Sequence, residues 1–318
     1  MDEASTIRVG VMGGGAVRSY FGARLAQAGV PVTLVGRPAH VAAIDADGLE
    51  LTSAGSVARV PFTASTSPDA LRDADVVLVC VKSTDTDAAA DALGGVVPPQ
   101  TLLVSLQNGV DNAWRISART PNPVVPAAVY VAVEMTAPGR LRHNGGGRLV
   151  LGHPVRRAEG TGGPDPMFDR LVALLARAGV PCLVSEDIRV DLWTKLTSNC
   201  AYNAISALAQ LRYRFLAADE GASDVMRMVT EENAAVAQAD GVPVTVEALA
   251  DAVRRIAEVM PEALSSTAQD LRLGRPTEIG DLNGFVVRRG HALGVPTPVN
   301  RTLQAHVALA ESTPRPTR

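Results

Sequence analysis

Three polar side chains with the spacing of one helical face are the strongest candidates for chemistry in this chain. Lys195, Asn199 and Asn203 lie four residues apart within the segment DLWTKLTSNCAYN, residues 191–203. The apolar residues of this segment recur at helical spacing, so it is predicted to be a helix. At about 100° per residue, positions i, i+4 and i+8 share one stripe of that helix. A lysine and two amides on such a stripe could bind a ligand, and the alternative is a solvated helix edge.

The use of lysine in this sequence favours a special role for Lys195. The chain has 30 lysines and arginines, of which 28 are arginines, so Lys82 and Lys195 are its two lysines. Arginine stays protonated in proteins, whereas a desolvated lysine can titrate and give up a proton. We therefore predict that Lys195 is catalytic or binds a ligand, with chance use of lysine as the alternative.

The length and composition are typical of a globular protein with two domains. One hydrophobic core rarely serves more than roughly 250–300 residues, and this chain has 318. A net charge of −3 argues against binding to nucleic acid or to a membrane surface. The sequence also lacks the run of about 18 apolar residues that a membrane span requires.

The cysteines and the N-terminal residues indicate the cytoplasm. Cys80, Cys182 and Cys200 are scattered in apolar contexts, so we expect reduced core thiols and neither disulfides nor a metal site. The opening residues, MDEASTIR, do not resemble a signal peptide. We therefore expect a cytoplasmic protein.

A glycine-rich turn near the N-terminus predicts a dinucleotide-binding fold. Residues 7–12 form a β-rich apolar run, GGGAV follows at once, a helical pattern ends at Gly29, and residues 32–35 form a second strand. Gly13 permits the tight turn, and Gly15 lets the backbone approach a pyrophosphate at the positive end of the helix. This strand, turn, helix and strand order is the context in which the glycines indicate dinucleotide binding.

Two arginines modify this prediction. Arg18 stands where the motif has its third glycine, so we expect its side chain to point away or the helix to sit farther from the strand. Gly36 and Arg37 follow the second strand, where an acidic residue would bind the ribose of NAD. Because Arg37 can pair with a 2′-phosphate, the sequence favours NADP(H) over NAD. The alternative is that Arg37 is only a loop cation.

Further strands deliver polar residues to the same edge of the predicted sheet. Residues 75–81 read as a buried parallel strand that ends at Lys82. Residues 101–106 lead to Asn108, which could touch the nicotinamide or its ribose, or could simply form the turn with Gly109. Residues 124–133 and 148–151 are predicted to be antiparallel edge strands. The glycine-rich turn HNGGGR would join them, with His143 as a turn residue.

The second half of the chain reads as all-helical. Helices are predicted for residues 219–240, 245–260, 262–273 and 281–293, and a last one begins at Pro298. We expect an α/β domain over residues 1–185, a helical domain over residues 186–312 and a flexible tail over residues 313–318. The alanine-rich helical faces could form a homodimer contact or belong to the core.

The assembled motifs resemble those of the ketopantoate reductase (2-dehydropantoate 2-reductase) family along nearly the whole chain. Two residues depart from the family pattern: Arg18 replaces the third glycine, and Gly280 stands where an aspartate is usual. The matching motifs are GGGAV with Arg37, Val81-Lys82, QNG at 107–109, DLWTKLTSN at 191–199, SSTAQD at 265–270 and TEIGDLNGF at 277–285.

The resemblance implies a fold and an activity. The fold is a Rossmann-type NADP-binding α/β domain followed by an all-α domain like the C-terminal domain of 6-phosphogluconate dehydrogenase. The activity is NADPH-dependent reduction of a small 2-oxo acid, ketopantoate, to (R)-pantoate in pantothenate and coenzyme A biosynthesis. Two rival functions remain: a paralogous reductase of another branched 2-oxo acid, and a non-catalytic NADP-binding regulator.

The resemblance also assigns roles to individual residues. Lys195 would donate the proton to the ketone, and Glu278 would be the acid where substrate and nicotinamide ribose meet. Alone, Glu278 reads as a first-turn helix acid and Ser266 as a packing residue. The implied substrate-binding residues are Asn199, Asn203 and Ser266. The implied cofactor contacts are Gly13, Gly14, Gly15, Ala16, Val17, Arg37, Lys82, Asn108, Ala132 and Glu278.

Overall fold

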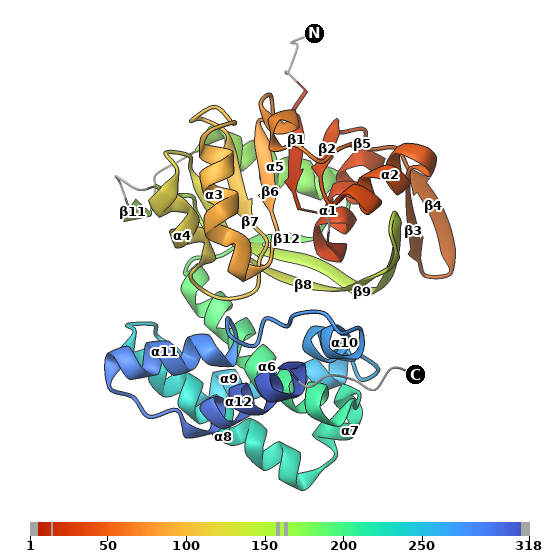
Figure 1. Cartoon of the computed structure of the whole chain (residues 1–318). Helices are drawn as coiled ribbons and strands as arrows, with labels where there is room; N and C mark the ends of the chain where they lie inside the picture. Colours follow the sequence, from red (N-terminus) through yellow and green to blue (C-terminus); the bar gives the residue numbers. More distant parts are fainter. Residues whose placement is uncertain (1–5, 14, 157–159, 162–164, 313–318) are drawn as a thin grey trace. The chain divides into compact units, whose positions relative to one another are not determined.

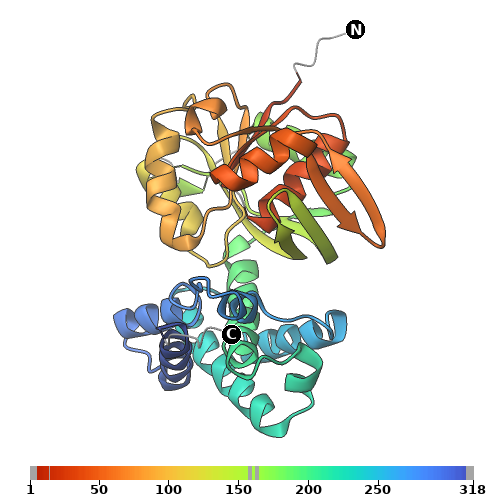
Figure 2. The same cartoon turned by 45° about the vertical axis from the view of Figure 1, so that its right-hand side comes forward.

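The computed structural model describes residues 6–13, 15–156, 160–161 and 165–312 of the chain. The chain divides into two compact units, Met1–Ile188 and Arg189–Arg318, which Figures 1 and 2 show from two directions. Gly14 and the tail at residues 313–318, both named in the sequence predictions, lie outside the described residues. Each unit is considered below by itself.

The first unit is built on a mixed β-sheet (Figure 1). Its central strands β8, β7, β6, β1, β2 and β5 run parallel to one another, and β9 is antiparallel to β8. Short strands β10 (Val155–Arg156), β11 (Gly160–Thr161) and β12 (Cys182–Val184) pair at its margins. The main order is β4 (Ser56–Val60), β3 (Leu49–Ser53), β9 (Arg140–Leu151), β8 (Val124–Ala137), β7 (Leu102–Ser105), β6 (Val76–Val79), β1 (Val9–Met12), β2 (Val32–Val35) and β5 (Thr63–Ser65).

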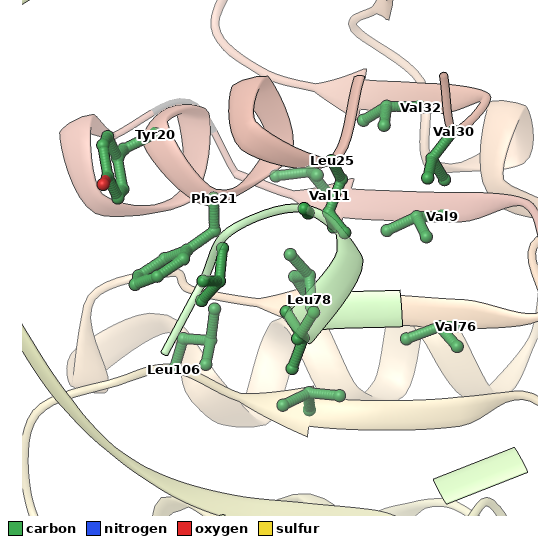
Figure 3. Packing of buried hydrophobic residues seen from close by; sticks show 14 of the residues in the cluster. Val9, Val11, Tyr20, Phe21, Leu25, Val30, Val32, Val76, Leu78 and Leu106 are labelled. Atoms are coloured by element: carbon green, nitrogen blue, oxygen red, sulfur yellow. The ribbon is translucent and has the colours of Figure 1, made fainter. Parts of the chain in front are cut away.

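Helices cover both faces of the central strands, which explains their continuous apolar character. Side chains alternate along β6, so Leu78 joins the core under one set of helices and Val77 joins the core under the other. On the first face, α1 (Ala16–Gln27) packs Phe21 and Leu25 onto the strands, as Figure 3 shows. Helix α5 (Pro166–Arg177) contributes to the same core. On the second face lie α3 (Thr86–Gly94) and α4 (Asn112–Arg119).

Glycines inside β9 correct the predicted position of the hairpin turn. The segment HNGGGR lies within β9, and the chain instead turns around Gly139, whose φ is 72°. Gly146 has a φ of 75°, and a Cβ there would lie 2.6 Å from the carbonyl oxygen of Tyr130. These glycines therefore serve register shifts in the β8–β9 ladder rather than a turn.

Two further predictions for this region are wrong. His143 is a strand residue, bonded through Nδ1 to Ser53 Oγ at 3.0 Å and stacked on the ring of Tyr20. Strands β8 and β9 are interior strands, because β3 and β4 extend the sheet beyond β9.

The second unit consists of helices packed around α6 (Ile188–Ala209). Trp193, Cys200 and Tyr202 of α6 are almost completely buried. Helix α10 begins later than predicted, since Ser265 caps it by accepting from the N–H of Ala268. Within the described residues, no helix is both long and apolar enough to cross a membrane. The other helices are α7 (Tyr213–Ala217), α8 (Glu220–Ala239), α9 (Val246–Val259), α10 (Ser266–Arg272), α11 (Asn283–Leu293) and α12 (Pro298–Ser312).

Candidate active site

The glycine-rich turn joins β1 to α1 and is fixed by backbone bonds. The N–H of Gly13 donates to the carbonyl of Val35 at the end of β2, at 2.8 Å, and Gly13 has a φ of 109°. Gly15 is the extended N-cap of α1, so Ala16 and Val17 are its first helical residues. The first N–H groups of a helix have no partner within the helix and point toward an anion placed there. The described part of this turn therefore suits a bound phosphate.

Three consecutive hydrogen bonds connect this turn to Gly139, and the sequence did not indicate them. The N–H of Gly139 donates to Nδ1 of His40 at 3.0 Å, so the ring proton lies on Nε2. His40 Nε2 then donates to Ser19 Oγ at 3.3 Å, and Ser19 Oγ donates to the carbonyl of Gly15 at 2.9 Å. Burial, with a smaller effect from the charge of Arg18, lowers the pKa of His40 and keeps this imidazole neutral.

The other predicted cofactor residues of this unit lie at the carboxyl ends of neighbouring parallel strands. Arg37 is exposed and is the N-cap of α2 (Pro38–Asp47), just beyond β2. Lys82 is half-buried beyond β6, and Asn108 is half-buried beyond β7. Because these strands are adjacent in the sheet, the three side chains occupy one edge with the glycine turn. That is the edge at which sheets of this kind bind ligands.

A buried polar network links the chain after β6 to the chain after β7. Gln107 Nε2 donates to Thr86 Oγ1 at 2.7 Å, and Thr86 Oγ1 donates to Asn112 Oδ1 at 2.9 Å. The carbonyl of Asn108 accepts from Ser83 Oγ at 2.9 Å and from Asn112 Nδ2 at 2.6 Å. The network thus fixes the backbone at Asn108 and beside Lys82. In the sequence, Gln107 of the QNG motif was the residue that could have indicated this network.

Ala132 lies on the part of β8 that extends beyond the carboxyl end of β7. The β7 pairing reaches Pro126, opposite Ser105, and Ala132 comes six residues later. At about 3.3 Å per residue, Ala132 therefore lies roughly 20 Å along the strand past that edge. Ala132 is half-buried opposite Gly145, between two register shifts.

In the helical unit, Lys195 has an environment that lowers its pKa. Its side chain is half-buried on α6, where its neighbours Leu192 and Leu196 belong to the core. Burial lowers the pKa of Lys195 to about 8, and the carboxylate of Glu278 opposes part of that decrease. Glu278 lies in the bend before α11 and is half-buried. The structure therefore brings these two predicted residues into electrostatic contact, and Lys195 can release a proton near neutral pH.

The amides of the stripe lie on the same helix and differ in exposure. Asn199 is half-buried, whereas Asn203 is 2% exposed. Ser265 Oγ donates to the carbonyl of Asn203 at 3.3 Å, which places Ser266, the first residue of α10, next to this end of the stripe. Ser266 itself is exposed.

A second buried network holds the far side of α6. Asn300 of α12 donates to Asn233 of α8 at 3.0 Å and to Glu232 at 2.8 Å, and it accepts from Asn283 of α11 at 2.9 Å. Asn283 also donates to the carbonyl of Cys200 at 3.2 Å, directly beside Asn199. The helix that carries the stripe is thereby tied to α8, α11 and α12. Isolated asparagines in the sequence did not indicate this network.

Replacing Asn300 by leucine should destabilise the helical unit. The change leaves the buried Oδ1 of Asn233 without its donor, at about 1–3 kcal/mol, and removes one hydrogen bond each from Asn283 and Glu232, which keep their bonds to backbone groups. The free energy of unfolding should fall by at least about 2 kcal/mol, measured by urea denaturation. Arg301→Ala, at an exposed position on the same helix, is the matched control and should leave stability unchanged. Equal stabilities of N300L and R301A would contradict a structural role for the network.

Together, these features define a class of protein. The first unit is Rossmann-type, with a glycine turn and a polar carboxyl edge, and the helical unit carries a titratable lysine. This combination is typical of a nicotinamide-dependent oxidoreductase.

Comparisons with known proteins identify the family. Residues 9–155 match the family "Ketopantoate reductase PanE/ApbA", and residues 187–311 match "Ketopantoate reductase PanE/ApbA C terminal". This chain belongs to the ketopantoate reductase family.

Individual relatives agree over nearly the full length. A 2-dehydropantoate 2-reductase of Mesorhizobium japonicum is 32% identical, with 95% of this chain and 96% of that protein covered. The corresponding protein of Halobacterium salinarum is also 32% identical, with 96% and 99% covered. The crystal structure of a PanE/ApbA family ketopantoate reductase from Ralstonia eutropha JMP134 is 48% identical and superposes with a TM-score of 0.87, covering 96% of this chain and 98% of that one.

Proposed function

We propose that this chain reduces 2-dehydropantoate to (R)-pantoate with NADPH, as a step of pantothenate synthesis. The observation that carries the proposal is Lys195, a lysine whose pKa is lowered to about 8 beside the Glu278 carboxylate, in a member of this family. The names of relatives that match over nearly the full length support the same substrate.

The residues present fit the cofactor. Gly13 adopts a backbone conformation that L-residues rarely take, and the N-terminus of α1 follows at the extended Gly15. Arg37 is exposed beyond β2, where a 2′-phosphate would need a cation. Lys82, Asn108 and Ala132 would provide further contacts along the same unit.

The chemistry assigns a task to each residue of the helical unit. When bound, NADPH supplies a hydride to the carbonyl carbon of the substrate. Lys195 gives a proton to the ketone oxygen as negative charge develops there, so that the carbonyl becomes a hydroxyl. Asn199, Asn203 and Ser266 hold the substrate's oxygens in position. Glu278 favours the protonated form of Lys195 before each turnover.

A second candidate substrate is another branched 2-oxo acid. Among the described residues, a Cβ on Gly280 would meet no atom within 4 Å, so the position two residues after Glu278 is open. The extra space could admit a different side chain on the substrate.

Two measurements in sequence test the proposed function. A fluorescence titration with NADPH establishes cofactor binding, and absorbance at the nicotinamide band then follows turnover across a panel of 2-oxo acids. We expect NADPH binding and the highest kcat/KM with 2-dehydropantoate. A higher kcat/KM with another acid would replace the substrate, and binding without any turnover would indicate a non-catalytic regulator.

Replacing Arg37 by serine should remove the preference for NADPH. A hydrogen bond to a charged group contributes about 1.5–3 kcal/mol, so Kd for NADPH should rise roughly 10- to 100-fold. Kd for NADH should stay the same, because NADH has no 2′-phosphate. Arg59→Ser, at an exposed position on β4, is the control and should change neither constant. A parallel loss of both cofactors in R37S would argue against this role.

A further inference from the structure

Arg18 folds back over the glycine-rich turn instead of pointing away from it. Its Nη1 donates to the carbonyl of Met12 at 3.3 Å. A Cβ added to Gly13 would lie 1.4 Å from Arg18 Nη1, and one added to Gly15 would lie 2.6 Å from Nη2. The guanidinium therefore packs directly against both glycines. The expectation that this side chain points away is wrong.

The charge of Arg18 acts at the carboxyl edge of the central strands. Burial raises the pKa of Cys80, the residue after β6, to about 12, and Arg18 acts in the opposite direction. Together with the bond to Met12 at the end of β1, this locates the cation where β1 and β6 end. This is the place at which the fold receives phosphates.

The position of Arg18 in its helix favours an anion beside it. Arg18 is the third residue of α1, whose first turn reads Ala16, Val17, Arg18 and Ser19. A cation in the first turn of a helix is unfavourable by about 0.3–1 kcal/mol, because the helix dipole is positive there. A phosphate at this position would be attracted by the helix N-terminus and by the guanidinium together.

We propose that Arg18 is a ligand of the cofactor's pyrophosphate, a role additional to those of the glycines. This inference rests on the proposed binding of NADPH. On binding, the guanidinium exchanges its bond to the neutral carbonyl of Met12 for bonds to phosphate oxygens. Charge-assisted bonds of this kind are roughly twice as strong as neutral ones, and the planar guanidinium matches two phosphate oxygens at once. Arg37 lies beyond the next strand and serves the 2′-phosphate instead.

The test separates the two phosphate groups with two probes. Fluorescence titration gives Kd for NADPH, and displacement of NADPH gives Kd for adenosine 2′-monophosphate, which lacks the pyrophosphate. For Arg18→Met we expect Kd for NADPH to rise about tenfold or more, equivalent to about 1.4 kcal/mol, with Kd for adenosine 2′-monophosphate unchanged. Arg37→Ser should weaken binding of both probes. NADPH binding by R18M should also be less sensitive to salt than that of the parent.

Each outcome distinguishes this inference from the proposed function. If the parent chain fails to bind NADPH, the proposed function fails and this inference fails with it. If the parent binds and R18M binds NADPH equally or more tightly, Arg18 only covers the turn and the inference alone is overturned. Equal weakening toward both probes in R18M would show general damage to the unit and would also overturn it. Arg18→Lys keeps the charge but lacks the planar guanidinium, so its Kd for NADPH should lie between those of the parent and R18M.

Discussion

Lys195→Ala loses most of its turnover and keeps its affinity for NADPH. A positioned general acid contributes typically about 10²- to 10⁴-fold, so kcat should fall by that factor. The physical reason is that charge developing on the ketone oxygen has neither a proton donor nor a nearby cation in the variant. Steady-state kinetics with 2-dehydropantoate give kcat, and fluorescence titration gives Kd for NADPH.

The chain's other lysine and a conservative variant supply the controls. Lys82→Ala should weaken NADPH binding with a much smaller effect on kcat, because Lys82 lies at the edge proposed to bind the cofactor. Lys195→Arg keeps a positive charge that does not give up its proton, so it should not restore kcat. Normal turnover by K195A would remove Lys195 from the mechanism.

Glu278→Gln moves the alkaline limit of activity to lower pH. Lys195 must be protonated to donate, so in the parent chain kcat should be level below its pKa of about 8 and fall above it. The Glu278 carboxylate raises that pKa against the effect of burial. Without this negative charge the pKa decreases further, and the decline in kcat should begin at a lower pH. The ratio of kcat at pH 6 to kcat at pH 8 should therefore be larger for E278Q than for the parent chain.

A matched carboxylate in the same unit serves as the control. Glu262 is exposed and pairs with Arg212 and Arg214, so Glu262→Gln should leave the pH profile unchanged. A pH profile of E278Q that coincides with the parent's would show that Glu278 does not set the protonation of Lys195. Loss of kcat without any shift would leave Glu278 with a substrate or cofactor contact only.

Local sequence patterns predicted the parts of the fold that are determined mainly by residues close together in the sequence. The strand, glycine turn and helix from Val9 to Gln27 could be predicted from nearby residues, since backbone freedom and hydrophobic periodicity act over a few positions. The same holds for the α6 stripe. Both domain classes, α/β and all-α, follow from the change of periodicity along the chain, and the family match and the crystal structure of a relative confirm the fold.

Features that depend on distant partners were missed. Strands β3, β4 and β5 have three to five residues each, too short for a clear alternating pattern, and form because their neighbours supply hydrogen bonds. The glycines of β9 have the composition of a turn, and pairing with β8 decides otherwise. His40 and Asn300 have defined partners only in the folded chain, where residues far apart in the sequence meet.

The segment from Glu278 to Asn283 connects Glu278 to a fixed attachment point on α6. Its first carbonyl accepts the N–H groups of Asp281 and Leu282, which winds the backbone into a fixed length. Its last residue is anchored to the carbonyl of Cys200, on the helix that carries Lys195. The position of Glu278 relative to the helix that carries Lys195 thus depends on the number of residues in this segment as well as on their side chains. Variants meant to alter substrate preference should therefore substitute side chains in this segment, for example at Gly280, where a Cβ meets no atom within 4 Å. They should not insert or delete residues.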